Sequence, residues 1–165
     1  DAMNRRFFLL GAAALVPACG MMPGQALALA PNSTLIVTRH ADRDGEDLNA
    51  RGRERARALV QAVKDFDIDL IFSPGIKRNL DTAAPLAGAR GLAVNRLPQE
   101  APTAGLVQSG AGKTLIWIGN KGNIATIWED LDLSEPMPIE YGDLHIVRAD
   151  AQGRVTIERR RYGPN

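Results

Sequence analysis

The apolar residues follow two different spacings along the chain after residue 31. Short runs of consecutive apolar and β-branched residues, at 34–38 (TLIVT), 70–73 (LIFS) and 113–118 (KTLIWI), predict strands that are buried on both faces. Between these runs, apolar residues recur every three or four positions, which predicts amphipathic helices. Strands that alternate with helices indicate a mostly parallel sheet covered on both sides.

Two helices carry residues that bear on where they begin and end. Asn49 can cap a helix that is expected to run to about residue 64. A second helix is expected from about residue 76, and Pro85 should kink it or end its first segment. A weaker strand is expected at 92–97 and a further helix at 123–131.

The last third of the chain predicts a hairpin. Residues 143–148 and 154–159 have the composition of strands and are joined by the short polar segment ADAQG. The predicted fold class is therefore α/β: a three-layer α/β/α sandwich with a mostly parallel sheet and an antiparallel C-terminal strand or hairpin. No repeat or linker interrupts residues 31–165, so these residues are expected to form one domain.

Residues 1–30 differ from the rest in composition. Asp1 and Ala2 precede Met3 and resemble an expression remnant, and then Arg5-Arg6, an apolar stretch at 7–16 and Ala-Leu-Ala at 28–30 follow. A basic segment, a short apolar core and a small-x-small site are typical of an export signal peptide. The apolar stretch is too short to cross a bilayer of roughly 30 Å. The predicted location is therefore periplasmic or extracellular.

Two details of this leader point in different directions. The sequence RRFFL resembles a twin-arginine signal, which would mean export in the folded state. The sequence VPAC, ending at Cys19, resembles a lipoprotein cleavage site, although its proline fits that site poorly. A membrane association is expected only if Cys19 is lipidated. The rest of the chain has no cysteine, so a disulfide within the mature domain is excluded.

The charge balance bears on the class of partner. Without residues 1–30, which hold one Asp and two Arg, acidic and basic residues are equal in number. Nucleic-acid binders usually carry a clear basic excess, so nucleic acid is not an expected partner. The alternating arginines of 51–57 are interrupted by Glu54 and are expected to form a solvated helix face.

Polar and cationic residues follow each predicted parallel strand. In open α/β sheets ligands bind at the carboxyl ends of the strands, so these residues are the first candidates for a site. They are Arg39 and His40 after the first strand, Ser73, Lys77 and Arg78 after the second, Glu100 after the third, and Asn120 and Lys121 after the fourth.

This set of residues suits phosphate chemistry. Arginine presents a planar fork of donors that matches phosphate oxygens, and two arginines from different strands can hold one phosphate. A neutral imidazole beside it can attack phosphorus, and the arginines would then stabilise the charge of the transition state. Metal catalysis lacks its usual ligands, because the chain has only two histidines and no HxxxH or HxH spacing. No metal or other cofactor is expected.

Three segments resemble those of a known family. They are Thr38-Arg39-His40 after a strand, LNARG at 48–52 opening a helix, and FSPGIKRNLDTAAPLA at 72–87. Their order and spacing are similar to those of the histidine phosphatase (phosphoglycerate mutase-like) superfamily. Its S-P-x-x-R-x-x-x-T-A element is matched by Ser73, Pro74, Arg78, Thr82 and Ala83, with one extra residue between Pro74 and Arg78. The resemblance extends over residues 34–162. The absence of a long insertion suggests the small bacterial branch without a cap domain.

The resemblance implies roles for particular residues. His40 would be the nucleophile that accepts the phosphoryl group, and Arg39 and Arg78 would bind phosphate. Arg43 and Ser73 would be further substrate contacts, with helix capping as the alternative for Ser73. Glu100 lies in the region that supplies the leaving-group acid in many members, although no motif marks it. The second histidine, His145, is interpreted as structural or surface.

Asn120 departs from the family pattern. The family has Gly-His where this chain has Gly119-Asn120, and the missing histidine donates a hydrogen bond to the transferring phosphoryl group. Asn can donate a hydrogen bond but carries no charge, and Lys121 is a weak substitute because of its different direction. Three interpretations stay open: a slow or narrow phosphatase that uses His40, a pseudoenzyme that binds a phosphorylated ligand or partner, or an engineered substitution that traps substrate.

The substrate class stays broad at this stage. Without a cap domain, small phosphoesters, phosphohistidine on proteins and phosphorylated envelope sugars all remain compatible with the site. Mutase activity is not expected, because it needs a closed site that retains the product. The expected partners are a small phosphorylated substrate or a phosphoprotein, and a phosphate or sulfate ion in the pocket.

Overall fold

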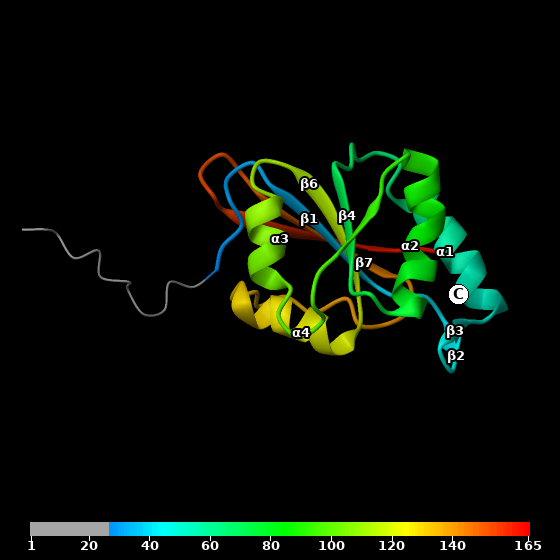
Figure 1. Cartoon of the computed structure of the whole chain (residues 1–165). Helices are drawn as coiled ribbons and strands as arrows, with labels where there is room; N and C mark the ends of the chain where they lie inside the picture. Colours follow the sequence, from blue (N-terminus) through cyan, green and yellow to red (C-terminus); the bar gives the residue numbers. More distant parts are fainter. Residues whose placement is uncertain (1–26) are drawn as a thin grey trace, which may run out of the picture.

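The computed structural model describes residues 27–165 (Figure 1). The predicted twin-arginine segment and Cys19 lie outside these residues. The elements are β1 (Thr34–Arg39), β2 (Arg43–Asp44), β3 (Asp47–Leu48), α1 (Ala50–Ala62), β4 (Leu70–Ser73), α2 (Lys77–Arg90), β5 (Val94–Arg96), α3 (Thr103–Ser109), β6 (Thr114–Gly119), α4 (Lys121–Asp130), β7 (Asp143–Ala149) and β8 (Val155–Arg161).

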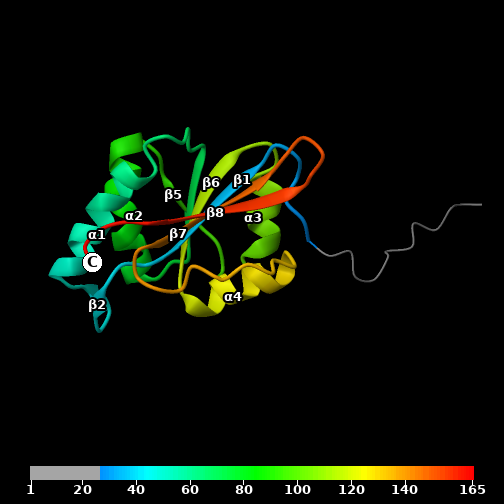
Figure 2. The same cartoon turned by 180° about the vertical axis from the view of Figure 1, so that it is seen from behind.

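The main sheet has the strand order β5-β4-β6-β1-β7-β8. The first four of these strands are parallel, and β7 and β8 add an antiparallel hairpin beside β1. Helices α1 and α2 cover one face of the sheet, and α3 and α4 cover the other (Figures 1 and 2). The predicted three-layer sandwich with a C-terminal hairpin is therefore confirmed.

The alternation of side chains along β1 and β6 builds a core on each face. On the side of α3 and α4, Val37 and Trp117 pack with Leu106 and Ile127. On the other side, strand residues pack with apolar residues of α1 and α2. The strand residues are Ile36, Ile116 and Ile118, and the helix residues are Leu59, Ala83 and Leu86. Burial of both faces explains why these strands have continuous apolar runs.

Helix α1 begins as the sequence predicts. The Asn49 side chain accepts a hydrogen bond of 2.9 Å from the backbone N–H of Gly52, and thereby caps the helix. Gly52 has no room for a side chain, because a Cβ there would lie 1.9 Å from the carbonyl oxygen of Asp42. The first turn of α1 is therefore packed directly against the segment that follows His40.

Helix α2 does not end at Pro85, which was one of the two predicted outcomes, and the other outcome, a kink, stays a prediction. The helix continues to Arg90, with Pro85 inside it. Proline removes one backbone hydrogen bond from the helix. Ala83 and Leu86 on either side are fully buried against the sheet. This burial holds the helix together across the missing bond.

Three short elements were not predicted. Helix α3 has only seven residues, with few apolar residues and a glycine, Gly105, packed against Leu97. Strands β2 and β3 are two residues each and form a small hairpin at residues 43–48. Elements this short carry too little periodicity to be recognised in the sequence.

Leu29 bears on the predicted boundary at residue 30. Its side chain is 6% exposed and packs in the core on the side of α3 and α4. Cleavage after Ala30 would remove this core side chain, and the boundary stays a prediction. None of the helices within residues 27–165 is long and apolar enough to span a membrane.

Candidate active site

The ends of β1 and β6 bring His40 and Asn120 next to each other. The two strands are parallel neighbours, and their last residues, Arg39 and Gly119, are paired. The backbone N–H of His40 donates a 2.8 Å hydrogen bond to the carbonyl oxygen of Gly119. The residues that follow the two strands therefore begin at the same edge of the sheet.

His40 is buried and its tautomer is fixed by a backbone contact. The residue is 2% exposed, and its Nδ1 lies 2.9 Å from the carbonyl oxygen of Ala41. A carbonyl oxygen can only accept, so Nδ1 carries the hydrogen and Nε2 keeps its lone pair. Of the two ring nitrogens, Nε2 is therefore the nucleophilic one.

The surroundings of His40 also keep its ring uncharged. Burial lowers the pKa of His40 most, the hydrogen bond to Ala41 raises it, and the charges of Arg39, Arg78 and Arg43 lower it further, to about 4. At neutral pH the imidazole is therefore neutral. A neutral imidazole beside several cations is ready to accept an electrophile that arrives with negative charge.

Arg39 turns toward the segment that precedes β7. Its Nη1 donates to the carbonyl oxygen of Ile139 (3.2 Å) and its Nη2 to the hydroxyl of Tyr141 (3.4 Å). The guanidinium carbon lies 4.1 Å from the centre of the Tyr141 ring. The Nε–H of Arg39 is buried and has no hydrogen-bond partner among the described residues.

Arg78 stands at the start of α2 and is held loosely. Its Nη1 pairs at 3.2 Å with the carboxylate of Glu46, which lies at the tip of the β2–β3 hairpin. The Glu46 side chain is 70% exposed, so this ion pair is a weak one. The Nε–H of Arg78 is buried and, within residues 27–165, also lacks a partner.

Thr82 connects the segment around His40 to α2. Its hydroxyl accepts a 2.9 Å hydrogen bond from the backbone N–H of Ala41 and donates a 2.7 Å bond to the carbonyl oxygen of Arg78. Asn79, also buried, donates to the carbonyl oxygen of Ile118 at 3.1 Å. The two side chains fix the start of α2 against the ends of β1 and β6.

Asn120 is the N-cap residue of α4 and is partly buried. Its backbone N–H donates to the Asn123 side chain at 3.0 Å, and that side-chain oxygen also accepts from the Trp117 indole at 3.1 Å. A Cβ at position 119 would come within 2.3 Å of both groups, which explains the glycine there. Lys121 is exposed at the first position of α4.

The remaining predicted residues differ in burial and in their contacts. Arg43 is exposed on the β2–β3 hairpin, and its charge contributes to lowering the pKa of His40. The Ser73 hydroxyl is fully buried and donates to the carbonyl oxygen of Pro74, while the N-cap of α2 is Ile76. Ser73 therefore does not cap the helix, and its role as a substrate contact stays a prediction. His145 is buried on β7 beside Trp128, as its structural interpretation predicts.

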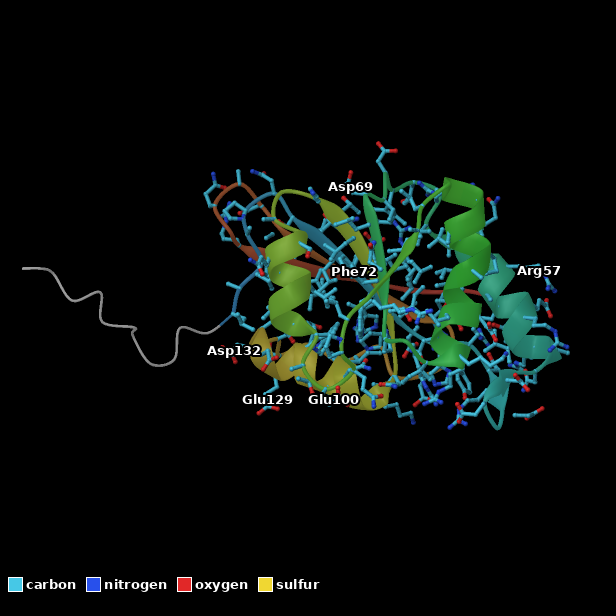
Figure 3. The ribbon with its side chains drawn as sticks, viewed as in Figure 1. Arg57, Asp69, Phe72, Glu100, Glu129 and Asp132 are labelled. Atoms are coloured by element: carbon cyan, nitrogen blue, oxygen red, sulfur yellow. The ribbon has the colours of Figure 1, made fainter. Side chains whose placement is uncertain are left out.

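Glu100 is on the loop that follows β5. In Figure 3, β4 runs from Asp69 toward Phe72, and the Glu100 side chain lies at the edge of the molecule in that direction. The residue is exposed, and no described contact joins it to His40 or to either arginine. Its position agrees with the edge of the sheet that holds the site, but it is not part of the contact network around His40.

Tyr141, Thr82 and Glu46 contribute to the site and were not among the predicted site residues. Thr82 was visible in the sequence as part of the S-P-x-x-R-x-x-x-T-A element. Tyr141 is separated from Arg39 by 102 positions. It lies in an irregular segment without a motif, so nothing in its neighbourhood marks it.

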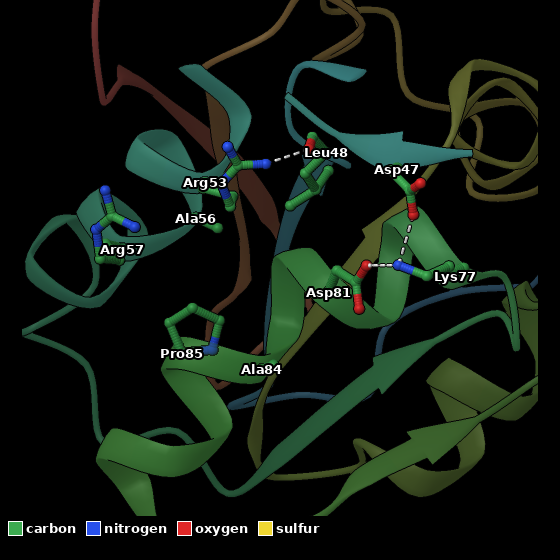
Figure 4. Close-up of a pocket in the computed structure, with 9 residues that line it drawn as sticks. All are labelled: Asp47, Leu48, Arg53, Ala56, Arg57, Lys77, Asp81, Ala84 and Pro85. Atoms are coloured by element: carbon green, nitrogen blue, oxygen red, sulfur yellow. Dashed lines mark hydrogen bonds and ion pairs between the residues drawn. The ribbon is translucent and has the colours of Figure 1, made fainter. Parts of the chain in front are cut away.

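A separate cavity of about 720 Å³ lies between α1 and α2 (Figure 4). It is lined by Asp47, Leu48, Arg53, Ala56, Arg57, Lys77, Asp81, Ala84 and Pro85. None of the residues around His40 lines it. Lys77, which the sequence placed among the strand-end residues, is paired there with Asp47 (2.8 Å) and Asp81 (2.6 Å).

The strand-end site is chemically suited to an oxyanion. Buried donors are nearly always paired, so the two unpaired Nε–H groups of Arg39 and Arg78 call for a ligand. Three arginine charges act on one neutral histidine, and no acidic side chain other than exposed Glu46 pairs with them in the described residues. Residues 27–165 contain no group of three His, Cys, Asp or Glu placed to hold a metal.

Comparison with known proteins agrees with this geometry. Residues 32–99 match the family model of the histidine phosphatase superfamily (branch 1). The matched residues include Arg39, His40 and Arg78 and end before Asn120. No curated protein sequence matches the chain significantly.

Several solved structures share the fold. A mycobacterial glucosyl-3-phosphoglycerate phosphatase, in complex with inorganic phosphate, is 16% identical with a TM-score of 0.58, over 81% of this chain and 98% of that chain. The protein histidine phosphatase SixA, complexed with tungstate, is 17% identical with a TM-score of 0.61, over 78% and 96%. YhfR of Bacillus stearothermophilus is 16% identical with a TM-score of 0.59, over 75% and 94%.

At such identities the structural likeness establishes the fold, and the family match adds the residues around His40. The family model agrees with the resemblance seen in the sequence over residues 32–99, and the chain shares the fold of these solved phosphatases.

Proposed function

We propose that this protein hydrolyses phosphomonoesters or phosphohistidine through a phosphohistidine intermediate on His40, without a metal. The observation that carries the proposal is the state of His40: neutral, with hydrogen on Nδ1 and a lone pair on Nε2, among arginine charges. A protonated ring could not attack phosphorus. The unpaired Nε–H groups of Arg39 and Arg78 add donors for the phosphate oxygens.

The reaction would proceed in two displacements. In the first, the Nε2 lone pair of His40 forms a bond to phosphorus, and the bond from phosphorus to the leaving oxygen or nitrogen breaks. The leaving atom keeps the electron pair and takes a proton from an acid or from water. In the second, water attacks phosphorus, the N–P bond breaks, and inorganic phosphate leaves a neutral His40. Arg39 and Arg78 would stabilise the equatorial oxygens in both steps.

The nature of the leaving group depends on which acid is available. Glu100 lies at the correct edge of the sheet and is the proposed acid for phosphoester substrates. It has no contact with the residues around His40, so this assignment rests on position. A phosphohistidine substrate has an imidazole leaving group, which depends less on an acid. A small phosphorylated molecule and a phosphoprotein are therefore both compatible with the proposal.

Asn120 supports a second candidate function. A charged donor at this position would contribute roughly twice the strength of a neutral one, so an amide there should slow the phosphoryl transfer. With a slow enough chemical step, the protein would act as a phosphate-binding pseudoenzyme that holds a phosphorylated ligand or partner. The arginines would serve that role equally well.

Turnover assays with matched variants separate the two functions. Purified protein is tested on para-nitrophenyl phosphate and on a phosphohistidine peptide, together with His40→Ala and Asn120→His. Activity that His40→Ala abolishes supports the phosphatase, and Asn120→His should then raise kcat by on the order of 10²-fold. Turnover only in Asn120→His supports the pseudoenzyme. Turnover that His40→Ala leaves unchanged shows that the nucleophile is wrongly assigned.

We also propose export through the predicted leader, with lipidation at Cys19 as the alternative to release. The motifs lie in residues 1–26, outside the described part of the chain. Fractionation of cells that express the protein, with Arg5→Lys/Arg6→Lys and Cys19→Ser variants, tests both ideas. If the double arginine variant stays in the cytoplasm, twin-arginine export is supported. If the Cys19→Ser variant loses a membrane-bound fraction that the parent has, lipidation is supported.

A further inference from the structure

Tyr141 is the residue of the site that neither the sequence motifs nor the family match account for. Its ring lies edge-on to His40 with centroids 5.9 Å apart, and beneath the Arg39 guanidinium, whose carbon is 4.1 Å from the ring centre. Its hydroxyl lies 3.4 Å from Nη2 of Arg39. One side chain thus contacts both the proposed nucleophile and one of the two phosphate-binding arginines.

The backbone around Tyr141 is held in place. Gly142 has φ 87°, and a Cβ there would meet the Arg55 guanidinium at 2.4 Å and the Tyr162 carbonyl oxygen at 2.7 Å. Only glycine fits a position with both that dihedral and that contact. The Tyr141 carbonyl oxygen also accepts a 3.1 Å hydrogen bond from Arg161. The ring is therefore presented to the site by a fixed segment rather than a free loop end.

The hydroxyl of Tyr141 still has its hydrogen to donate. Arginine can only donate, so the contact with Arg39 uses a lone pair of the hydroxyl. Among residues 27–165, no hydrogen bond is found in which this hydroxyl donates. A phosphate oxygen bound by Arg39 would be close to this O–H. The donor therefore lies beside the arginine that would hold the transferring group.

The geometry points to Tyr141 as a further catalytic residue that donates a hydrogen bond to the phosphoryl group held by Arg39. This inference rests on the proposed function of His40. It also bears on Asn120, because a donor from the segment before β7 would partly compensate for the charged donor that the strand end at β6 lacks. The hydroxyl supplies a neutral donor, so the replacement restores a contact and not a charge.

Substitution of Tyr141 by Phe isolates the hydroxyl. The ring, its stacking on Arg39 and its contact with His40 are all kept. Only the hydroxyl is lost, with its O–H donor and the lone pair that accepts from Arg39. Tyr162→Phe is the matched control, since Tyr162 is the other tyrosine of the chain and its hydroxyl bonds to the Thr38 hydroxyl (2.9 Å) and not to the Arg39 guanidinium or His40. A third variant, Tyr141→Leu, also removes the stacking.

We expect Tyr141→Phe to lower kcat on para-nitrophenyl phosphate by on the order of 10²-fold with KM within about twofold. Binding of vanadate, which adopts the geometry of the transition state, should weaken in parallel, and binding of inorganic phosphate should change little. Tyr141→Leu should in addition weaken phosphate binding. Tyr162→Phe should leave all three quantities unchanged.

The inference is overturned if Tyr141→Phe keeps both kcat and vanadate affinity within about twofold of the parent. Equal losses of phosphate and vanadate affinity would also overturn it, because they would show that the hydroxyl only orients Arg39. If His40→Ala retains turnover, the proposed function fails independently of Tyr141. In a parent without turnover, vanadate binding by calorimetry still decides the role of the hydroxyl.

Discussion

The arginines at the strand ends differ from the arginine that holds α1 to the rest of the domain. Arg55 is buried, and its guanidinium donates to Asp42 (2.6 Å), to the Tyr162 carbonyl oxygen (2.7 Å) and to the Pro164 carbonyl oxygen (2.9 Å). Arg39 and Arg78 each keep a buried Nε–H that has no partner within the described residues 27–165. The same side-chain type is thus fully paired in one region and left incomplete in the other.

This difference separates structural from functional charge. An unpaired buried donor costs free energy, so it is retained only where something else, such as a ligand, pairs with it. Arg55 contributes to the folded state on its own, whereas Arg39 and Arg78 are complete only with an anion. Substitutions in the two regions should therefore affect different measurements.

The largest effect is expected from Arg39→Ala. Removing an arginine that stabilises the transferring phosphoryl group costs on the order of 10³-fold or more in kcat/KM. The free energy of unfolding in phosphate-free buffer should change by only about 1 kcal/mol, because repulsion among the three arginines is relieved. Steady-state kinetics and urea unfolding check the two halves of this prediction.

Arg154→Ala is the control for Arg39→Ala, since that side chain is 79% exposed and pairs only with Asp150 on the β7–β8 turn. It should leave kcat/KM unchanged. A loss of several kcal/mol of stability in Arg39→Ala, with activity retained, would reverse the assignment of the two regions.

The next largest effect is expected from Arg55→Ala. Breaking a buried ion pair by removing one partner typically costs about 3–5 kcal/mol, because the other charge stays buried and unpaired. Asp42 keeps a contact with Arg51 at 3.3 Å, so the lower end of that range is expected. Urea unfolding measures the loss, and the matched Arg55→Met variant separates packing from charge. A loss below about 1 kcal/mol would show that the contacts of Arg55 are dispensable.

The third prediction concerns the protonation of His40. Its pKa should be about 4, so NMR of the imidazole nitrogens should show a neutral ring with hydrogen on Nδ1 throughout pH 5–8. The unfolded chain binds this proton near pH 6.5, so stability from this group is complete above about 6.5 and falls as the pH drops toward 4. His145→Gln removes the other histidine signal. A midpoint near 6.5 would contradict the burial of His40 among arginines.

Phosphate should move this midpoint. A bound dianion favours the charged imidazole, so the pKa of His40 should rise when phosphate is added. Arg78→Ala should reduce this rise, because one of the two phosphate-binding side chains is lost. An unchanged midpoint at saturating phosphate would mean that the anion binds elsewhere.

The sequence predicted those parts of the molecule that are encoded locally. Strand β1 is a continuous apolar run, and Asn49 caps α1 as its type and position indicate. The positions of His40 and Asn120 after adjacent strands follow from the rule that parallel strands end at one edge. Each of these features depends on a few consecutive residues.

Features that depend on long-range packing could not be predicted. Tyr141 reaches Arg39 only because β7 inserts antiparallel beside β1, which no local pattern specifies. Pro85 failed as a helix end because core packing outweighs the missing backbone bond. Ser73 does not cap α2, the alternative predicted for it, because its hydroxyl bonds to the next residue, Pro74. Motifs indicate which residues matter but not which way each side chain turns.

The smallest effect on stability is expected at Arg160, which forms ion pairs with exposed acidic residues. It lies on β8 and pairs with Asp65 at 2.8 Å and with Glu158, whose side chains are 53% and 39% exposed. Water competes for these acidic groups, so Arg160→Ala should cost at most about 1 kcal/mol in urea unfolding. The cost should shrink further in 1 M NaCl, where screening acts over about 3 Å. A loss as large as that of Arg55→Ala would mean that pairing, and not burial, decides how much an arginine stabilises this fold.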